Sequence, residues 1–410
     1  MVSARQTRLL ACHVLLTYLP SLAGCGGEDA RSSGPLVRDS AGVRILENKG
    51  PRWPGATGWR LSHAAVLDIG VLEGDANYQL YRVTDARRLS DGRVVAANSG
   101  TNELRFYDAA GRYLSTAGRE GGGPGEFQGL FDLWTLAEDS LLTYDFRNHR
   151  VSLFNADGEF VRSFDLHTLI GAGVSPDVVG PFADGSLLVA GRQSFASGEI
   201  RGGLRREPNL YLRCDPEGAR VDSLGRFPGD EWYVITEENR MMASTRAFGR
   251  RPVAAVHGDA FYFGHTDSYE LAQYDQSGRL VRLIRKAQPN LPVTAEDTER
   301  LIKDEMTDAE DESQRTFIRQ MYAEMPFPQT MPAYRSLVVD ADGNLWVEDY
   351  RRPGDKQPRW TVFNSGGEML GLVETPPRFT VFEIGSDFVL GLWIDDLDVE
   401  HVQLYALFKD

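Results

Sequence analysis

The sequence predicts an all-β fold built from copies of one four-stranded unit. Residues 118–164 contain a complete copy, in which a glycine-rich loop precedes four strand-like segments separated by two tight turns and a polar loop. Glycine is abundant, with 42 residues, and turns that contain glycine recur at regular intervals, which favours many short strands. A chain of small, repeated sheets is typical of a β-propeller, in which each sheet is one blade around a central channel.

Two kinds of turn mark the repeat. A short turn of the Asp-Gly type joins the first two strands of a unit, and a turn of the Asx-x-x-Gly type joins the last two. In the second kind, the Asp or Asn side chain caps the turn and glycine takes the positive φ that closes it. The short turns lie at 91–92, 138–139, 184–185, 258–259, 342–343 and 386–387, and the Asx turns at 108–111, 155–158, 215–218, 275–278 and 364–367. Six turns of the first kind against five of the second predict six blades, of which the last lacks its outer strand.

A strand near the N-terminus is predicted to fill that missing position. The segment 65–72, AVLDIGVL, is strand-like and precedes the first complete unit. The last blade would otherwise end with its third strand near 402–408 and leave an unpaired edge. The N-terminal strand is therefore expected to close the last blade, which covers edges that would otherwise be exposed.

The first residues have the pattern of an export signal. Arg5 and Arg8 precede an apolar stretch, 9–19, that is too short to span a bilayer. Leu22-Ala23-Gly24-Cys25 then resembles a bacterial lipobox, in which the cysteine is acylated and becomes the new N-terminus. An ordinary cleavage site beside a chance cysteine is the alternative. Acylated Cys25 would anchor the protein stably, and Gly26 at the next position fits sorting to the outer membrane.

The remaining chain divides into a short tether and one large domain. After the signal peptide, 1–24, the small and polar segment 25–42 is predicted to be a flexible tether, and 43–410 to be the propeller. Cys214 is alone in the retained domain, so no intrachain disulfide is expected. A formal net charge of −15 and an isoelectric point near 5.0 argue against a nucleic-acid partner, because phosphate binding needs clustered basic residues.

One segment, 294–325, departs from the β pattern. Thr294 and Asp297 have the spacing of a capping box, and apolar residues follow at three- and four-residue intervals. The segment is predicted to be a helical insertion between blades four and five. It carries ten acidic residues against four basic ones, which is typical of a solvated surface.

The unit at 118–164 resembles an NHL-type repeat. The matching residues are Gly121, Gly123, Gly125, Phe127, Leu141–Asp145, Asn148, Arg150, Val151, Phe154 and Gly158. Taken whole, the chain resembles the bacterial six-bladed β-propeller lipoproteins of the NHL-repeat-like family. Most members of that family have no assigned activity, so the resemblance implies a fold and an envelope location rather than a reaction.

The long loops are expected on one face of the propeller. Four elaborated segments, 192–208, 228–251, 287–334 and 350–359, fall on the face opposite the short turns. Function on β scaffolds is usually carried by such loops, so this face is the candidate ligand face. Its candidate residues are Asn98, Asp145, Arg147, Asn148, His149, Arg192, His265, Asp267, Asp349, Arg351, Asp395 and Asp396.

Five of these residues are weak candidates for a metal site. Asp145, Asp349 and Asp395 occupy matching blade positions and could ring the channel mouth to bind Ca²⁺, which needs several oxygen ligands. The alternative is that each aspartate caps its own loop. His149 and His265 form the best histidine pair for a metal or a general base. No other cofactor is predicted.

The sequence favours a non-catalytic binding scaffold in the cell envelope. Its partner would be an envelope protein, a peptide or a glycan, and its contact with the membrane would be through the lipid anchor only. A metal-dependent hydrolase or lyase is the alternative, because six-bladed propellers of similar shape include lactonases and an amidating lyase. Shared fold alone is a weak reason to assign an activity.

Overall fold

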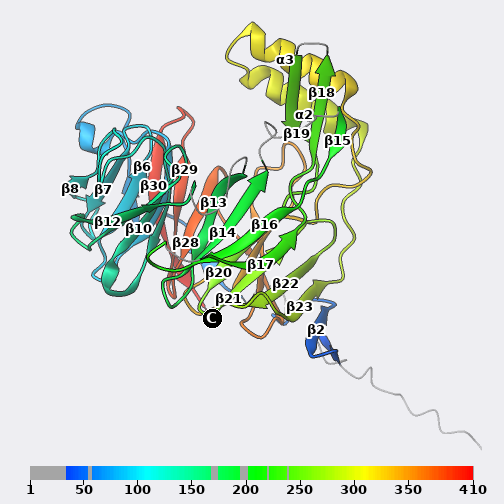
Figure 1. Ribbon diagram of the computed structural model, residues 1–410, viewed down its shortest axis with the longest axis horizontal. Coiled ribbons are helices and arrows are strands. Elements are labelled where there is room, and N and C mark those ends of the chain that lie inside the picture. Colours follow the sequence, from blue (N-terminus) through cyan, green and yellow to red (C-terminus); the bar gives the residue numbers. More distant parts are fainter. Residues whose placement is uncertain are drawn as a thin grey trace, which may run out of the picture. The chain divides into compact units, whose positions relative to one another are not determined.

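The computed structural model describes residues 34–53, 58–167, 174–193, 202–218, 221–237 and 240–409, which are mostly β (Figure 1). The predicted signal peptide, 1–24, and Cys25 lie outside the described residues. So does the first half of the predicted tether, 25–33.

Six sheets follow one another along the chain, each with antiparallel pairing between successive strands. Sheet 1 contains β5 (Val83–Arg88), β6 (Val94–Asn98), β7 (Glu103–Tyr107) and β8 (Tyr113–Ala117), and sheet 2 contains β9 (Leu130–Thr135), β10 (Leu141–Asp145), β11 (Arg150–Phe154) and β12 (Phe160–Asp165). Sheet 3 contains β13 (Val174–Pro181), β14 (Leu187–Gln193), β16 (Asn209–Cys214) and β17 (Val221–Phe227), and sheet 4 contains β20 (Val253–His257), β21 (Ala260–Gly264), β22 (Glu270–Asp275) and β23 (Leu280–Lys286). Sheet 5 contains β24 (Tyr334–Val339), β25 (Leu345–Asp349), β26 (Arg359–Phe363) and β27 (Met369–Glu374), and sheet 6 contains β28 (Phe379–Ile384), β29 (Phe388–Ile394) and β30 (Glu400–Phe408).

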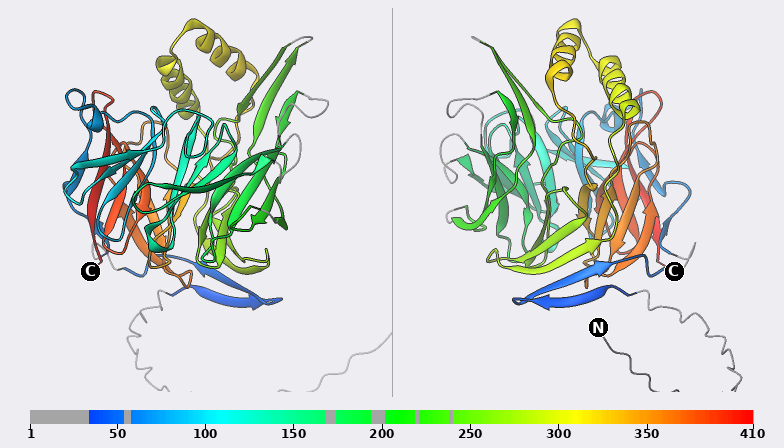
Figure 2. Two further views of the ribbon diagram at one scale, coloured as in Figure 1. Left: turned by 60° about the vertical axis from the view of Figure 1, so that its left-hand side comes forward. Right: turned by 90° about the vertical axis from the view of Figure 1, so that its right-hand side faces the viewer.

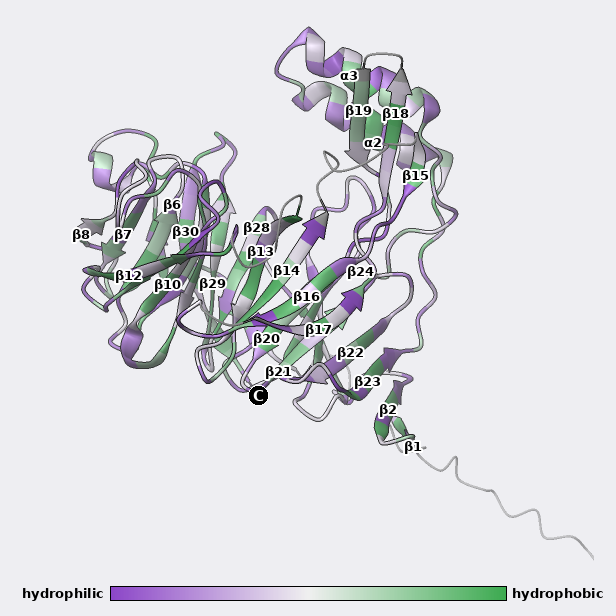
Figure 3. Cartoon of the chain, viewed as in Figure 1, coloured by the Kyte–Doolittle hydropathy of each residue, from purple (hydrophilic) through white to green (hydrophobic). Residues whose placement is uncertain are grey.

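The sheets are arranged in a ring. Their first strands contact one another in the cyclic order β5, β9, β13, β20, β24, β28 and back to β5. Apolar side chains fill the space between neighbouring sheets, and Figure 3 shows hydrophobic residues along many of the central strands. This is the arrangement of a β-propeller.

The Asx turns form as their sequence predicts. In the first of them, Asp108 Oδ1 accepts the backbone N–H groups of Ala110 at 2.9 Å and Arg112 at 2.8 Å, and Gly111 has a φ of +77°. Asn155, Asp275 and Asn364 accept the equivalent pair of N–H groups in their own turns. A capped turn at the end of the third strand sets the register of the fourth.

The N-terminal segment supplies the outer edge of sheet 6. Strand β4 (Leu67–Ile69) lies within the predicted segment 65–72 and pairs antiparallel with β30, and a second short strand, β3 (Arg60–Leu61), pairs with the end of β30. Leu67 and Ile69 are buried in the core between sheets 6 and 1. The N-terminal and C-terminal parts of the chain therefore share one sheet.

Part of the predicted tether is a strand. Strands β1 (Leu36–Ser40) and β2 (Val43–Asn48) form a hairpin, and β2 pairs in parallel with β23, which extends sheet 4. The pairing is stabilised by burial of Ile45 and Leu46 and by the Asn48 amide, which donates to the backbone oxygen of Arg285 in β23 at 3.1 Å. The same amide accepts the N–H of Met369 of sheet 5 at 2.9 Å. The flexible tether predicted over 25–42 is therefore wrong for residues 36–42, which belong to this hairpin. Figure 2 shows this hairpin at the opposite end of the molecule from the helices.

Two helices lie between β23 and β24, within the segment predicted to be helical. They are α2 (Ala295–Asp308) and α3 (Glu312–Glu324). The predicted capping box starts α2, because Thr294 Oγ1 accepts the N–H of Asp297 while Asp297 Oδ2 accepts the N–H of Thr294. Asp311 caps α3 through the N–H of Gln314 at 2.8 Å.

The helices pack against a small sheet that the sequence analysis does not predict. Strands β15 (Gly203–Arg205), β18 (Trp232–Glu237) and β19 (Arg240–Thr245) form this sheet within two of the elaborated loops. Its apolar residues Ile235 and Met242 cluster with Phe248 and with Met321 and Met325 of the helical segment. We call β15, β18, β19, α2 and α3 the cap (Figure 2).

Candidate functional site

A pocket of about 600 Å³ lies between the cap and sheets 4 and 5. Its walls come from four separate stretches of the chain and from Thr266. The stretches are 244–251 at the end of β19, helix α2 with part of α3, and the segments 332–336 and 350–355 that flank sheet 5. Ligand pockets in proteins commonly have volumes of roughly 300–1,000 Å³. The pocket is therefore large enough for a small organic molecule or a short peptide.

One side of the pocket is rich in arginine. Arg251, Arg335 and Arg351 all line it. Arg351 and Arg335 share one carboxylate, that of the buried Glu348, at 3.2 and 3.9 Å. Among the described residues, no carboxylate lies within 4 Å of Arg251, whose guanidinium donates to Thr245 Oγ1 at 2.8 Å. This side therefore carries more positive than negative charge.

The other side is acidic. Asp304 and Glu305 line it from helix α2, whereas Asp355, in the loop that follows β25, lies beside Arg351, which donates to its backbone oxygen at 3.4 Å. Glu305 Oε1 accepts the hydroxyl of Tyr322 at 2.7 Å. Asp304 lies 3.9 Å from Arg300, and about half of each of these two side chains is exposed. The pocket thus has two charged sides of opposite sign.

Aromatic side chains lie between these two sides. Phe248, Tyr322 and Tyr350 line the pocket. Burial raises the pKa of the Tyr350 hydroxyl, although the nearby guanidinium groups of Arg251 and Arg335 act to lower it. Tyr350 therefore stays neutral at physiological pH, and its ring adds apolar surface to the pocket.

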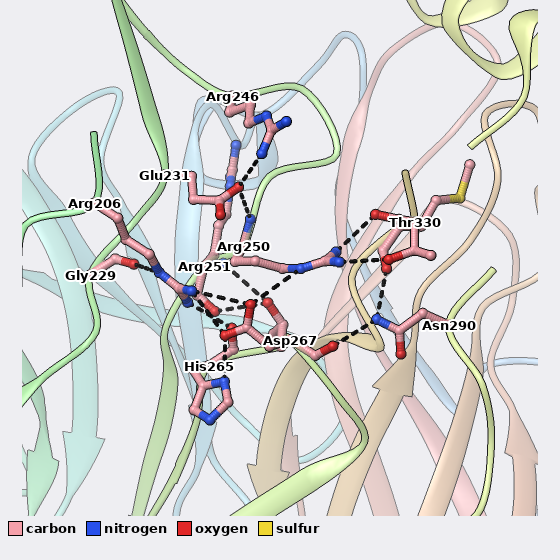
Figure 4. Close-up of polar contacts among 12 residues, drawn as sticks. Arg206, Gly229, Glu231, Arg246, Arg250, Arg251, His265, Asp267, Asn290 and Thr330 are labelled. Carbon is pink, nitrogen blue, oxygen red and sulfur yellow. Dashed lines mark hydrogen bonds and ion pairs between the residues drawn. The ribbon is translucent and has the colours of Figure 1, made fainter. Parts of the chain in front are cut away.

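A network of polar contacts centred on Asp267 holds the base of the cap against sheet 4 (Figure 4). The Asp267 carboxylate accepts from Arg206 at 2.9 Å and lies 2.6 Å from His265 Nδ1 and 3.5 Å from Arg250 Nε. Burial acts to raise the pKa of Asp267, but the contacts with His265 and Arg206 outweigh it and lower the pKa to about 2. Asp267 is therefore charged at any pH at which the protein is folded under ordinary conditions.

Further bonds extend this network to the segment that returns from the helices. Arg250 donates to the backbone oxygen of Thr330 at 3.0 Å, and Asn290 donates to the backbone oxygens of Asp267 and Met331 at 3.0 Å each. Arg246 Nη1 lies 3.1 Å from Glu231 Oε2, and Figure 4 marks this ion pair with a dashed line. The residues that connect the cap to the ring are thus tied together beside the pocket.

The three aspartates of the predicted Ca²⁺ ring are each used locally. Asp145 caps its own loop by accepting the N–H groups of Arg147 and Asn148 at 3.0 Å. Asp395 accepts those of Leu397 and Val399 at 2.8 Å. Asp349 accepts the hydroxyl of Thr361 of sheet 5 at 2.9 Å and that of Tyr269, which directly precedes β22 of sheet 4, at 3.1 Å. Within the described ranges no three His, Cys, Asp or Glu side chains gather so as to hold a metal ion.

The two histidines of the predicted pair have separate surroundings. His149 stacks on His167 with ring centroids 5.5 Å apart, whereas His265 contacts Asp267. Of the twelve candidate residues, Arg351 lines the pocket, and His265 and Asp267 belong to the adjoining network.

The other candidates lie elsewhere on the loops. Asn98 accepts the N–H of Tyr81, and Arg192 pairs with Asp177 at 2.5 Å. Asp396 lies 3.8 Å from Arg378, and Arg147 lies over the ring of Phe146. The pocket thus lies among the elaborated loops, but most of the predicted residues do not line it.

Buried acidic residues of the innermost strands were missed. Asp85, Asp132 and Glu383 belong to β5, β9 and β28. Burial raises the pKa of Asp85 to about 7 against the opposing effect of Arg87. Burial and the neighbouring Asp85 also raise the pKa of Asp132 well above its usual value. The sequence signal that could have found them is an acidic residue within the first strand of successive repeats.

The remaining pocket residues carry no comparable signal. Arg251, Arg335, Asp304 and Glu305 are ordinary surface residue types in segments far apart in the sequence. They come together only because the cap folds back over sheets 4 and 5. Within the described residues, no helix has both the length and the apolar character needed to cross a membrane.

Comparisons with known proteins identify the fold. No protein-family model and no curated protein matches the chain. A member of the DUF4221 family from Bacteroides vulgatus has 12% sequence identity and a TM-score of 0.53, and the alignment covers 86% of this chain and 99% of that one. A protein from Bacteroides fragilis described as exported has 12% identity and a TM-score of 0.50, with 89% and 99% covered. At such identities these likenesses support the β-propeller fold and leave the activity open.

Proposed function

We propose that this protein is an exported, lipid-anchored β-propeller that binds a ligand without transforming it. Each of the six sheets in cyclic contact is one blade, β3 and β4 close the last blade, and α2 and α3 are an insertion between blades four and five. The repeat at 118–164 relates the chain to the NHL-repeat-like lipoproteins. Export is supported by the signal-like pattern at the N-terminus and by the likeness to a structure described as exported.

The observation that carries the binding function is the pocket under the cap. It is built from elaborated loops on a rigid ring, and a dense polar network fixes the cap beside it. Rigid walls favour binding, because little ordering of side chains is then required when a ligand enters. The ligand would be a peptide, a glycan or a segment of an envelope protein that fits about 600 Å³.

Filling the pocket is expected to abolish binding. Ser244 of β19 lines the pocket, and Ser244→Trp would add a bulky side chain there without removing a charge. Wild-type protein is screened by thermal shift against peptide and glycan panels, and any ligand found should lose at least tenfold in affinity for the variant. Ser115→Trp on the exposed face of β8 is the matched control and should bind normally. Ligands that bind Ser244→Trp as tightly as wild type would place the site elsewhere.

Lipid anchoring is expected to depend on Cys25. Cys25→Ala removes the only thiol that the lipobox-like segment can acylate, so the variant should leave the membrane fraction and appear in the soluble fraction. Cys12→Ala, in the segment that is removed, should have no effect. Mass spectrometry of the N-terminal peptide checks the modification. A wild-type peptide without lipid, together with a membrane-bound Cys25→Ala variant, would contradict the anchor.

A further inference from the structure

We propose that the pocket under the cap binds a zwitterionic ligand of the short-peptide class, with its carboxylate against the arginine side and its ammonium group against helix α2. This proposal rests on the proposed binding function and specifies the chemistry of the same site. It follows from three features of the pocket: an excess of positive charge on one side, accessible carboxylates on the other, and aromatic surface between them.

The arginine side has more guanidinium groups than carboxylates to pair with them. The segments beside the pocket contain Arg206, Arg246, Arg250, Arg251, Arg335 and Arg351, whose carboxylate partners among the described residues are Glu231, Asp267 and Glu348. Arg352, which also lines the pocket, pairs with Asp297 of helix α2. The excess is local, since the whole chain has a formal net charge of −15. An anionic group bound here would therefore relieve repulsion among the guanidinium groups as well as gain hydrogen bonds.

Donors remain available on this side. Arg251 uses its guanidinium for one neutral acceptor, Thr245 Oγ1, and the side chain of Arg335 is 61% exposed. Guanidinium groups bind carboxylates through two parallel hydrogen bonds, and such charge-assisted bonds are about twice as strong as neutral ones. A ligand carboxylate would supply the acceptor that these donors lack.

The side formed by α2 favours a cation. The carboxylate of Asp304 has a distant ion pair with Arg300 at 3.9 Å, and that pair is half-exposed and therefore weak. Glu305 accepts one hydrogen bond, from Tyr322, which leaves its second oxygen for a donor. An ammonium group carries three donors and no acceptor, so either carboxylate can accept a hydrogen bond from it.

Other ligand classes fit this pocket less well. A phosphate dianion would be attracted by the arginines but repelled by Asp304 and Glu305, whose charges lie in the same pocket. A neutral glycan would leave charged donors and acceptors without charged partners while taking away their water, which costs free energy. Phe248, Tyr322 and Tyr350 suit an apolar side chain of the ligand between the two charged ends.

Three pooled libraries of random tripeptides test the proposal. One pool has free termini, one is amidated at the C-terminus, and one is acetylated at the N-terminus. The free pool is expected to raise the melting temperature, and native mass spectrometry identifies the bound members. Each terminal block is expected to reduce the affinity of those members at least tenfold. No shift with the free pool, or an equal shift with the blocked pools, would overturn the proposal.

Two charge variants assign each terminus to its side of the pocket. Arg251→Gln should weaken binding of free peptides and leave amidated peptides unaffected, whereas Asp304→Asn should weaken free peptides and leave acetylated peptides unaffected. Arg319→Gln on helix α3, whose partner is Glu312, is the control and should bind normally. If either variant lost the same affinity for free, amidated and acetylated peptides, the substitution would act on the structure of the pocket. That result would contradict the assignment of each terminus to its side.

The outcomes separate this proposal from the proposed function. Some ligands could bind wild type but not Ser244→Trp, with an affinity that does not depend on charged termini. That result would keep the pocket as the binding site and overturn the proposal of a zwitterionic ligand. Absence of any ligand from both the peptide and the glycan panels would overturn both.

Discussion

Deletion of residues 65–72 is expected to abolish cooperative folding of the ring at 25 °C. The deletion removes β4, so the backbone groups of β30 that pair with it lose their partners. It also removes Leu67 and Ile69, whose loss costs about 2–5 kcal/mol each when such side chains are truncated in a core. Asp68, which accepts from Gln403 at 2.9 Å, is lost as well. The sum approaches the entire stability of a typical domain, about 5–15 kcal/mol.

Urea denaturation followed by circular dichroism measures this effect, and point variants provide a graded control. Ile69→Ala, at a side chain 1% exposed, should lower the free energy of unfolding by about 2–5 kcal/mol. Val66→Ala, in the same segment but 62% exposed, should change it by less than about 0.5 kcal/mol. A deletion variant that unfolds at the wild-type urea concentration would show that the ring does not need this strand.

Asp85→Ala is expected to destabilise the protein by about 3–5 kcal/mol, because it breaks a buried ion pair and leaves the charge of Arg87 without its partner. Arg87 Nη2 donates to Asp85 Oδ2 at 2.7 Å. The same guanidinium donates to the backbone oxygens of Leu133 at 2.7 Å and Phe382 at 2.5 Å. One side chain therefore connects the first strands of sheets 1, 2 and 6 around the channel.

A double-mutant cycle distinguishes this pair from independent effects. Asp85→Ala combined with Arg87→Ala should cost clearly less than the sum of the two single variants, because neither charge is then left unpaired. Asp91→Ala, which removes the partner of Arg93 on an exposed turn, is the control and should cost no more than about 1 kcal/mol. Additive losses for Asp85 and Arg87 would mean that the two side chains act separately.

Local sequence patterns were sufficient for the repeating parts of the fold. The Asx turn at Asp108–Gly111 needs only a side-chain acceptor and a residue that tolerates positive φ, and both are set within four residues. The capping box at Thr294 and Asp297 is equally local, and it begins α2 as predicted. Such features could be found from the sequence because their partners are a few residues apart.

The cap sheet was missed for a related reason. Strands β18 and β19 lie in a stretch flanked by glycine, proline and arginine, so the local pattern indicated a loop. Their apolar side chains, such as Ile235 and Met242, are buried by Met321 and Met325, which are about 80 residues away. A strand that is stabilised by distant helices is not specified by its own residues.

The sequence by itself determined the β repeat, its turns, the capped helices and the face that carries the long loops, since each depends on contacts between near neighbours in the chain. The tertiary structure decided the pocket. Arg251, Asp304, Arg335 and Arg351 belong to segments that meet only when the cap packs over sheets 4 and 5. The electrostatic interaction between two side chains depends on their separation in space, not in sequence. The sequence therefore could not show that these charges form one site, because packing and the Asp267 network fix their positions.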